Sequence, residues 1–535
     1  MSAPQPDLSE TLADPTALAA PRARGVLGRA PALSTAAVRS WMLTAVLVLV
    51  PLLAYWPTTF HEFGLRDDYS NLRESHEEPG KILQFCASHA RPIYGFFLQS
   101  SYGRTSSVED LRWMRLAGAL ILGAISLAMF RGLQTLGWSF EASLCVSVLL
   151  PLLPASQVIA AWAVGWPYAA AALLAIGGFF AAEGALTAPA EGAGRLAKRA
   201  AQWTGACALM LESALTYQPS TLFYVVPLAA ALTARPHRSR SLSWLGAHVS
   251  LIAVSLALAY AVMMLLYSHG VFVRSGRVAF EQHFGEKLAW FLGEALPNAL
   301  SLLVLNDDHH RGRGAYLACA AAIGLVLLVG LTHEWRRHGP RRGLIWLAGL
   351  AGLPVLAFGI NLIAAERYAT YRTLLAMSAV LVCFLVASMR ALTAHWPIAN
   401  RTLLAALGLT AAFLAARHHA YALIAVPQGN EWQLILDGAK RVRLGASAPP
   451  RVFAIASTPE DASTASIYHD EFGSLSSNSE WVPKEMFKRA MHDLHPDIAD
   501  LDGRYSFATG PKLPAERQFD LVVDMRRLHE FYEDD

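Results

Sequence analysis

The chain has 535 residues and a mass of 58.0 kDa; 54% of its residues are hydrophobic and only 16% are charged. Ordinary globular proteins carry about 25% charged residues, so this composition excludes a soluble enzyme. The mean hydropathy of +0.34 also excludes a disordered chain and a coiled coil. Long charge-free runs recur between residues 40 and 427, and their apolar surplus must face lipid. The composition predicts a mainly α-helical protein that crosses a membrane many times.

Charge is distributed unevenly along the chain. Residues 430–535 hold 12 Lys and Arg against 19 Asp and Glu, a net charge of −7, which leaves +10 for the rest. We therefore expect a disordered cytoplasmic arm over residues 1–38, a transmembrane domain over 39–427 and a soluble α/β domain over 428–535. The five cysteines form no CxxC pair and four lie in apolar runs, which argues against a disulfide framework or a zinc site.

The spacing of apolar runs predicts the membrane spans. A hydrocarbon core of about 30 Å needs roughly 20 apolar residues per crossing helix. On this basis eleven spans are expected, over residues 40–60, 111–136 (with Arg112, Arg115 and Arg131 snorkelling at its ends), 142–182 (two, folded near Pro151 and Pro154), 199–235 (two, broken at Tyr217, Gln218 and Pro219), 241–267, 314–332, 343–365, 368–389 and 402–421.

Residues 288–305 contain Glu294 and Pro297 and allow two interpretations, a full crossing or a re-entrant segment. Basic residues are enriched in cytoplasmic loops, and arginines before the first span place the N-terminus in the cytoplasm. The later cluster Arg336, Arg337, Arg341 and Arg342 then falls on the cytoplasmic side only if residues 288–305 turn back. We therefore expect a re-entrant segment, with the N-terminus inside and the C-terminus outside.

The tail alternates helix-like and strand-like pieces. Residues 432–444 and 481–494 are expected to be helical, and residues 451–455 and 519–523 are expected to be strands of a small extracytoplasmic α/β domain. In the expected orientation, this tail shares one side of the membrane with residues 61–110, the break at Tyr217, residues 306–310 and residues 366–372.

The first outer loop, residues 61–110, opens with an adjacent acid pair, Asp67 and Asp68. In an extended stretch neighbouring side chains point to opposite sides, so one carboxylate can face a cleft while the other binds backbone, an arginine or a metal. The carboxylate in the cleft would be a general base that deprotonates an acceptor hydroxyl. The alternative is that both acids cap the following helix, with Arg66 or Arg73 as surface partners.

Arginines at two further positions suit a phosphate. Arg91 precedes Pro92 and an aromatic run, where it would either hold a phosphate or only snorkel. A helix beginning at Glu366 would place Arg367 over Tyr371 and Tyr368 over Arg372 at i, i+4 spacing. Guanidinium groups bind phosphate bidentately, whereas the alternative for these residues is a surface cluster of Arg367 with Glu366 and acidic loop partners.

Three weaker signals each allow a functional and a structural interpretation. Tyr217, Gln218 and Pro219 offer hydrogen bonds at the membrane rim or form an ordinary turn. Glu212 in its apolar run is either a structural contact or a proton-transfer group. Residues 306–310 have the types of metal ligands, but one short run without a distant partner favours a solvated loop.

These features together resemble bacterial GT-C-type integral-membrane glycosyltransferases, and among them the relatives of O-antigen glucosyltransferases. The resemblance depends on the cytoplasmic N-terminus, the acid pair Asp67 and Asp68, Arg91 before Pro92, the break at Tyr217 to Pro219, and Arg367 with Arg372. It covers the layout of residues 1–425 and does not extend to the tail.

The resemblance implies a sugar donor on a polyprenyl phosphate and a glycan or lipid acceptor of the cell envelope, with transfer outside the bacterial inner membrane. It implies Asp67 or Asp68 as base or metal partner. The donor-binding set is then Arg91, Arg367, Arg372 and Tyr371, and the substrate-lining set is Tyr69, Tyr217, Gln218 and Glu366. A divalent cation, Mg²⁺ or Mn²⁺, is left open as a cofactor; nucleic acid is not expected as a partner.

The same residues suggest one reaction mechanism, and two alternative functions compete with it. A carboxylate that deprotonates the acceptor, with arginines on the leaving phosphate, predicts a single inverting displacement of a hexosyl or pentosyl group. A transporter or flippase would show inverted repeats and paired broken helices, which the sequence lacks. A lipid-linked glycan ligase or polymerase would share the outer arginines without requiring the acid pair.

Overall fold

The computed structural model describes residues 35–187, 193–234, 242–276, 279–303, 313–445, 448–456, 475–498, 500–514 and 518–531. The chain divides into two compact units, Met1–Leu43 and Thr44–Asp535. In the first unit the described residues form the start of helix α1, and the rest of the predicted arm lies outside the described residues. The second unit holds the remainder of α1 and the elements that follow.

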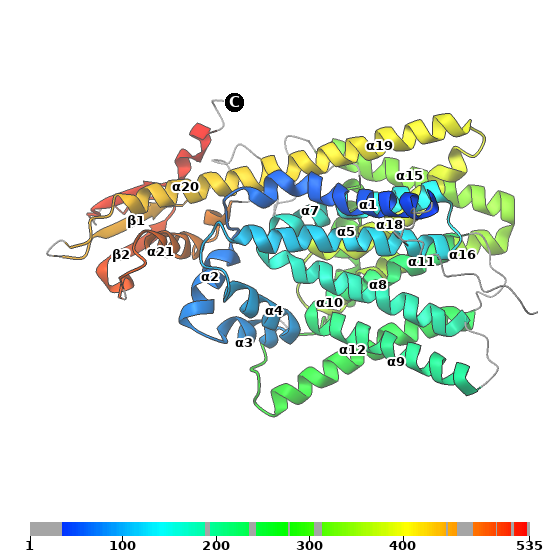
Figure 1. Ribbon diagram of the computed structural model, residues 1–535, viewed down its shortest axis with the longest axis horizontal. Coiled ribbons are helices and arrows are strands. Elements are labelled where there is room, and N and C mark those ends of the chain that lie inside the picture. Colours follow the sequence, from blue (N-terminus) through cyan, green and yellow to red (C-terminus); the bar gives the residue numbers. More distant parts are fainter. Residues whose placement is uncertain are drawn as a thin grey trace, which may run out of the picture. The chain divides into compact units, whose positions relative to one another are not determined.

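Long helices build the second unit and run side by side along it (Figure 1). They are α1 (Thr35–Phe60), α5 (Leu111–Thr135), α8 (Trp166–Thr187), α9 (Ala193–Thr216), α12 (Leu242–Ser268), α15 (Arg313–His338), α16 (Pro340–Ala357), α18 (Leu375–Leu392) and α19 (Ile398–His418). Shorter helices between them are α6 (Phe140–Leu149), α7 (Pro154–Ala161), α10 (Gln218–Thr221), α11 (Val225–Thr233), α13 (Phe284–Trp290), α14 (Leu296–Ser301) and α17 (Gly359–Ile363). Single 3-10 turns are η1 (Leu150–Leu152), η2 (Ala163–Gly165), η3 (Leu222–Tyr224) and η6 (Tyr371–Leu374), and π-helical turns are η5 (Phe291–Ala295) and η7 (His419–Ala425).

The prediction of a polytopic, mainly α-helical fold is confirmed. Among the described residues, seven helical segments are long and apolar enough to cross a membrane, and the pair α6 with α7, bent by 50°, makes up to eight. The other three expected spans coincide with α9, with α10 to α11 and with α16 to α17, which do not meet that standard of length and apolarity. The chain is a multi-pass membrane protein.

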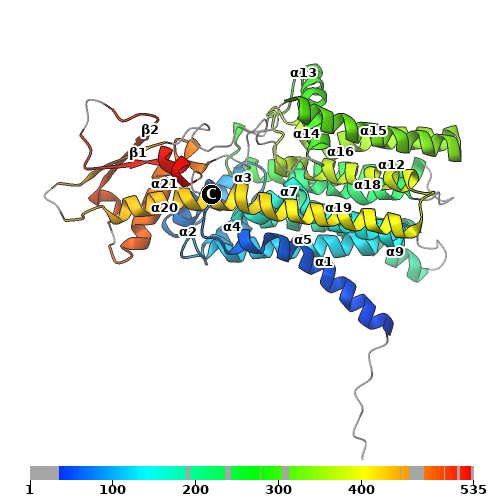
Figure 2. The same cartoon turned by 90° about the horizontal axis from the view of Figure 1, so that it is seen from above.

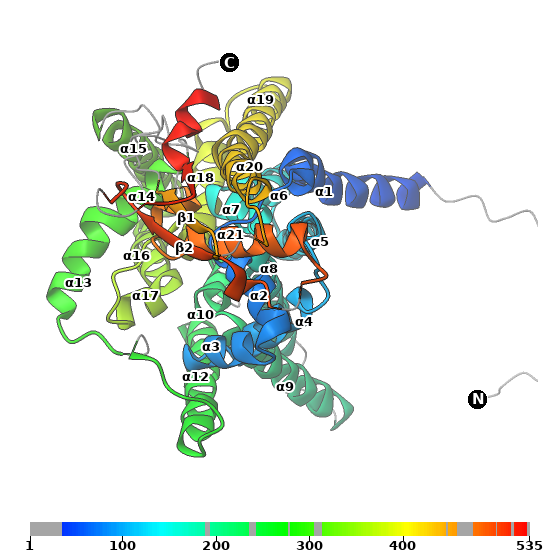
Figure 3. The same cartoon turned by 90° about the vertical axis from the view of Figure 1, so that its left-hand side faces the viewer.

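The segment over residues 288–305 does not run along the bundle. It folds as α13, η5 and α14, and Figure 3, which views the long helices close to end-on, shows α13 from the side. This helix lies across the long helices, and the re-entrant path of the segment stays a prediction. Its continuation beyond residue 303 lies outside the described residues up to Arg313.

The first outer loop folds into three helices, α2 (Asp67–Glu77), α3 (Lys81–Ser88) and α4 (Pro92–Tyr102). Arg115 of α5 holds the start of this loop. Its guanidinium donates to the carbonyl oxygens of Thr59, His61 and Phe63 at 3.2, 2.7 and 2.8 Å, and the side chain is fully buried. The prediction that Arg115 snorkels is therefore wrong, because carbonyls left free where α1 ends provide interior partners.

The tail contains a three-stranded parallel sheet in the order β2-β1-β3. Its elements are β1 (Arg451–Ile455), β2 (Ser506–Gly510), β3 (Leu521–Asp524), α21 (Val482–Leu494) and the short turns η8 (Ser476–Asn478), η9 (Asp502–Arg504) and η10 (Met525–Phe531). The expected strand 451–455 and helix 481–494 are confirmed, whereas β2 was not anticipated. Phe453 in the central strand is 3% exposed, as expected in a parallel sheet, whose faces are usually covered.

The last span continues into the tail without a linker. Helix α19 passes through η7 into α20 (Val426–Lys440), so that one helical segment covers Ile398–Lys440. At 1.5 Å per residue, its 43 residues extend about 64 Å, twice the hydrocarbon core. Figure 2 shows this helix running from the bundle directly against the tail. The expected boundary between residues 427 and 428 is thus the interior of a helix.

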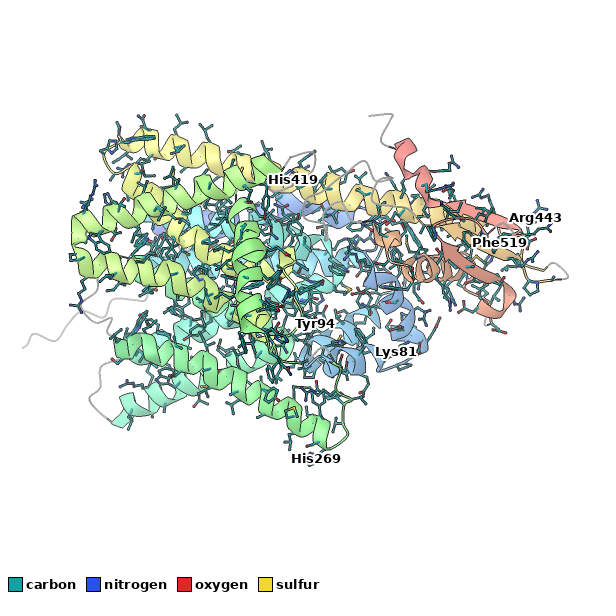
Figure 4. All side chains as sticks on the ribbon, turned by 180° about the vertical axis from the view of Figure 1, so that it is seen from behind. Lys81, Tyr94, His269, His419, Arg443 and Phe519 are labelled. Atoms are coloured by element: carbon teal, nitrogen blue, oxygen red, sulfur yellow. The ribbon has the colours of Figure 1, made fainter. Side chains whose placement is uncertain are left out.

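The predicted outer groups gather at one end of this unit. Figure 4 shows Tyr94 of α4, His269 beyond α12 and His419 of η7 at a similar level along the long axis, with Arg443 and Phe519 at the far end of the tail. The connection between α15 and α16, which carries the expected cytoplasmic arginines, lies at the opposite end of the bundle (Figure 1). The two ends therefore differ in the chemistry that they present.

Candidate active site

A cavity of about 800 Å³ opens where the first outer loop meets the bundle. Its walls come from the end of α3, from α10 and α12, and from residues 360–373. Six of the ten residues singled out in the sequence line it: Arg91, Tyr217, Gln218, Glu366, Arg367 and Arg372. The other lining residues are His89, Ala90, Pro219, Leu256, Ala257, Ala259, Tyr260, Met263, Ala279, Phe280, Ile360, Asn361, Ile363, Ala364, Tyr368 and Thr373.

Arg91 is held in the cavity by the turn that precedes it. Ala90 has a φ of 61°, which is uncommon for a residue with a Cβ and persists only where the surroundings hold it. The Tyr267 hydroxyl accepts from the Ala90 N–H at 3.1 Å, and Gln218 Nε2 donates to the Ala90 carbonyl at 2.5 Å. Gln218 Oε1 then accepts from Arg91 Nε at 3.3 Å. One amide side chain therefore orients both the turn and its arginine.

An aromatic wall separates Arg91 from Arg372. The Arg91 guanidinium lies 4.7 Å from the ring centre of Tyr217, which packs on Tyr168 with a centroid separation of 4.1 Å. On the other side, the guanidinium of Arg372 lies 4.7 Å from the ring centre of Trp162 and 5.9 Å from that of Tyr168. These cation–π contacts fix the positions of the two guanidinium groups.

The backbone around Arg367 and Arg372 differs from the helix that was expected there. Residues 364–370 are not helical, and the helix predicted to begin at Glu366 begins at Tyr371. The prediction of an i, i+4 helical stack is therefore wrong, although Arg372 Nη2 still donates to the Tyr368 hydroxyl at 2.7 Å. Arg367 pairs with Glu286 of α13 at 2.7 Å, and because both side chains are exposed this pair is weak.

The electrostatics of the cavity favour an anion. Three guanidinium groups line it, and Glu366 is the one acid among its described lining residues. The Glu366 main chain is held from behind, because Lys287 Nζ donates to its carbonyl oxygen at 2.5 Å. Burial lowers the pKa of Lys287, and the nearby Glu281 carboxylate partly reverses this effect. Lys287 thus supports the rim of the cavity without lining it.

Asp67 and Asp68 begin helix α2, and the structure gives them different surroundings. Asp68 is fully buried; its carboxylate accepts from the Leu65 N–H at 2.8 Å and from the Tyr102 hydroxyl. Burial raises the pKa of Asp68 to about 7, although the Tyr102 hydrogen bond works against it. Asp67 is exposed on the same turn. One acid thus binds backbone, as expected, but from a helix and not from an extended stretch.

Neither acid lines the cavity. The charges of Asp67 and of Arg91 nevertheless both affect the same residue, Cys86. Burial raises the pKa of the Cys86 thiol in α3 to about 12, while Arg91 lowers it and Asp67 raises it by smaller amounts. The Asp67 carboxylate and the Arg91 guanidinium therefore both act on the same buried thiol.

The two remaining predicted residues, Tyr69 and Tyr371, do not line the cavity. Tyr69 is fully buried and exchanges hydrogen bonds with the Gly64 backbone at 3.1 and 3.2 Å. Tyr371 is also fully buried, at the start of η6. Glu212 is exposed on α9 and lines no part of the cavity. Residues 306–310, considered for a metal, lie outside the described residues, and the described residues contain no group of three His, Cys, Asp or Glu that would hold a metal ion.

The sequence analysis missed Asn361 and His89. Asn361 is 8% exposed, lines the cavity from α17, and its Nδ2 has no hydrogen-bond partner among the described residues. An amide inside an apolar run is a detectable signal, since such groups are costly in lipid unless they are used. His89 contacts Ser275 Oγ through Nε2 at 3.3 Å. Nothing in the sequence indicates that contact, because 186 positions separate the two residues.

Comparison with solved structures finds distant likenesses. The archaeal oligosaccharyltransferase AglB from Archaeoglobus fulgidus, in complex with an inhibitory peptide and a dolichol-phosphate, is 11% identical with a TM-score of 0.42 over 85% of this chain. The chain spans 64% of the length of that AglB, less than two thirds. ArnT from Cupriavidus metallidurans, bound to undecaprenyl phosphate, is 13% identical with a TM-score of 0.31 over 78% of this chain and 83% of ArnT.

Sequence comparisons find neither a matching family model nor a matching curated protein. Because the structural likenesses are distant, the assignment of a function depends on the residues of the cavity.

Proposed function

We propose that this protein is an integral-membrane glycosyltransferase of the GT-C type, which moves a sugar from a polyprenyl-phosphate donor to a cell-envelope glycan or lipid. The observation that carries the proposal is the division of one cavity into a cationic rim and an apolar wall. Arg91, Arg367 and Arg372 provide the rim, and α12 with α17 provides the wall. An amphiphile with an anionic head matches this division.

The apolar wall is deep enough for the first part of a lipid chain. Along α12 the lining runs from Leu256 to Met263, and the helix ends at Ser268. At 1.5 Å per residue, the distance from Leu256 to the end of the helix is about 18 Å. Leu258 and Leu265 on the same helix are exposed, as side chains facing lipid would be. The chain of a bound donor would therefore leave the cavity directly into the bilayer.

The chemistry we propose is a single inverting displacement of a hexosyl or pentosyl group. The carboxylate of Asp67 takes the proton of the acceptor hydroxyl, whose oxygen attacks the anomeric carbon while the bond from that carbon to the phosphate oxygen breaks. Arg91, Arg367 and Arg372 stabilise the charge on the leaving phosphate. Asp67 serves better than Asp68 in this role, because the buried Asp68 carboxylate already binds Leu65 and Tyr102.

We also propose on which side of the membrane the site opens and what the tail does there. We place it on the extracytoplasmic side of the bacterial inner membrane, with the tail over the loop that carries Asp67. There the tail would help to bind the acceptor, because α21 packs on α2 and Arg73 Nε binds Glu485 at 2.8 Å. A divalent cation, Mg²⁺ or Mn²⁺, remains open as a helper of the acid pair.

Two measurements test the proposal separately. Purified protein in lipid nanodiscs is titrated with undecaprenyl phosphate; we expect the double variant Arg91→Gln/Arg372→Gln to bind at least about tenfold more weakly, since charge-assisted bonds are the strong ones. Arg112→Gln, which changes an arginine of α5 that does not line the cavity, is the matched control. Equal affinities for wild type and double variant would remove the donor site.

The base is tested by sugar transfer in membranes. Asp67→Asn is expected to lower the rate by about 10²- to 10⁴-fold, the usual contribution of a general base, without weakening undecaprenyl phosphate binding. Wild-type transfer by both Asp67→Asn and Asp68→Asn would exclude the carboxylate mechanism and favour a glycan ligase or polymerase.

A further inference from the structure

The turn that presents Asp67 is strained and is held from outside the loop. Arg66, directly before Asp67, has φ 46° and ψ −101°, and no side chain caps the helix that begins there. A residue with a Cβ is strained in this conformation and keeps it only where the surrounding structure imposes it. Something other than the local sequence therefore determines where Asp67 lies.

The tail provides the missing contact. The Arg66 N–H donates to Ser476 Oγ at 2.9 Å, and the same hydroxyl donates to Gln428 Oε1. Glu431 fixes the backbone that carries this serine, because its carboxylate accepts from the N–H groups of Ser476 and Ser477 at 2.8 and 3.0 Å. We call Gln428, Glu431, Ser476 and Ser477 the turn lock.

All four side chains of the turn lock are buried, with exposures of 1% or less. Helix α20 also contacts residues on both sides of this turn in the sequence through Trp432. Tyr69 stacks on Trp432 with a centroid separation of 5.6 Å, and Trp432 Nε1 donates to Glu62 Oε1 at 3.0 Å. A buried carboxylate is retained only with such hydrogen bonds, so breaking one part of the turn lock destabilises the rest.

We infer that the turn lock is a positioning device for the transfer reaction, through which α20 and the tail set the conformation of Arg66 and so the place of Asp67. None of its members lines the cavity, so its members act through Asp67 and not on the substrate. The inference rests on the proposed role of Asp67. It assigns to the tail a part in catalysis that is separate from binding the acceptor.

The first test needs no substrate. Ser476→Ala removes the acceptor of the Arg66 N–H and the donor to Gln428, whereas Ser476→Thr keeps a hydroxyl. We expect Ser476→Ala to speed hydrogen–deuterium exchange of the amides over residues 65–69 by about tenfold or more, since a buried donor is left unsatisfied. The threonine variant should restore protection. Gln428→Ala is the second variant, should Ser476→Ala fail to fold.

The matched control is Glu485→Gln, which weakens the same interface between α2 and α21 without touching the turn. It should leave exchange over residues 65–69 unchanged. Equal exchange in wild type and Ser476→Ala, or an equal increase in Glu485→Gln, would overturn the inference.

The second test separates positioning from folding. With undecaprenyl-phosphate glucose as the donor, Ser476→Ala should lower kcat roughly 10- to 100-fold, the range expected for a misplaced group. Its KM and its affinity for undecaprenyl phosphate should stay near those of the wild type, and Glu485→Gln should keep its kcat. Wild-type turnover in Asp67→Asn would defeat the proposed role of Asp67 as the base, whereas wild-type turnover in Ser476→Ala with an inactive Asp67→Asn would defeat only this inference.

Discussion

Two neighbouring carboxyl groups at the start of α2 show how strongly the surroundings decide what a residue does. Asp68 is buried against Leu65 and Tyr102, and its pKa is raised to about 7 from an ordinary value of 3.8. Asp67, one position earlier, is exposed. The first holds the start of the loop, and the second is the carboxyl group that we propose as the base.

The raised pKa of Asp68 predicts how stability depends on pH. The folded protein binds the Asp68 proton more tightly than the unfolded chain, so this group favours folding below about pH 4 and loses that effect as the pH rises toward 7. The loss is on the order of 4 kcal/mol at most. We expect the melting temperature in detergent to fall across this window, and to fall less in Asp68→Asn.

Asp67→Asn is the control for this slope, because it removes the neighbouring exposed carboxyl and leaves Asp68 in place. An unchanged slope in Asp68→Asn would mean that another group causes the pH dependence.

Arg372 predicts a difference between arginine and lysine. Its planar guanidinium lies over Trp162 and donates to the Tyr368 hydroxyl, so a lysine would keep the charge and lose the geometry. Arg372→Lys should weaken binding of undecaprenyl phosphate several-fold, and Arg372→Gln should weaken it further, by about tenfold or more. Isothermal titration calorimetry in nanodiscs measures the affinities of both variants. Equal affinities of the lysine variant and the wild type would mean that Arg372 contributes to binding through its charge alone.

Among the helices, α12 is held by polar contacts near both ends while its outward face is apolar. Near its start, Glu183 of α8 accepts from Trp244 Nε1 at 2.7 Å and lies 3.2 Å from His248 Nε2. At its outer end, the Tyr267 hydroxyl donates to the Ala87 carbonyl at 2.8 Å and accepts from the Ala90 N–H. The helix that forms the apolar wall of the cavity is therefore tied to the turn that carries Arg91.

This connection predicts that a single hydroxyl on α12 affects the donor site. Tyr267→Phe should loosen the strained Ala90 turn and weaken undecaprenyl phosphate binding about three- to tenfold, since a lost hydrogen bond contributes about 1 kcal/mol. Ser268→Ala is the matched control, because that hydroxyl donates to Leu265 of its own helix. Similar losses in both variants would indicate a general weakening of α12.

At the scale of the whole molecule, segments distant in sequence meet at one end of the second unit. Gln218 contacts Arg91, Arg73 contacts Glu485, and Arg417 Nη1 in the last span donates to the Leu53 carbonyl at 2.8 Å. The loop of residues 61–110 is thereby joined to Gln218 beside the cavity and to the tail through Glu485. A function on one side of the membrane requires this convergence.

The same convergence predicts the orientation of the C-terminus. A reporter fused after Asp535 that is active only outside the cytoplasm should be active, because arginines before the first span and between α15 and α16 favour the cytoplasmic side. A cytoplasmic reporter at the same position should stay dark. The opposite pattern would move the cavity and the tail to the cytoplasmic face.

Local sequence was sufficient to predict most of the spans, because a helix in lipid must satisfy its own backbone within about 20 apolar residues. The same holds for β1, a short apolar run recognisable without its partners. The types of residue at the site were also predictable: six of the cavity's lining residues, including its three arginines, stand out as polar groups at the ends of apolar runs.

Tertiary structure alone decided which of these groups meet and which face inward. Arg115 is buried because the end of α1 offers it carbonyl oxygens, and Asp68 is buried because Tyr102, 34 positions away, donates to it. The turn lock joins Arg66 to Ser476 across 410 positions. Partners so distant leave no pattern in the local sequence, since hydrogen bonds between them depend on packing that only the folded chain creates.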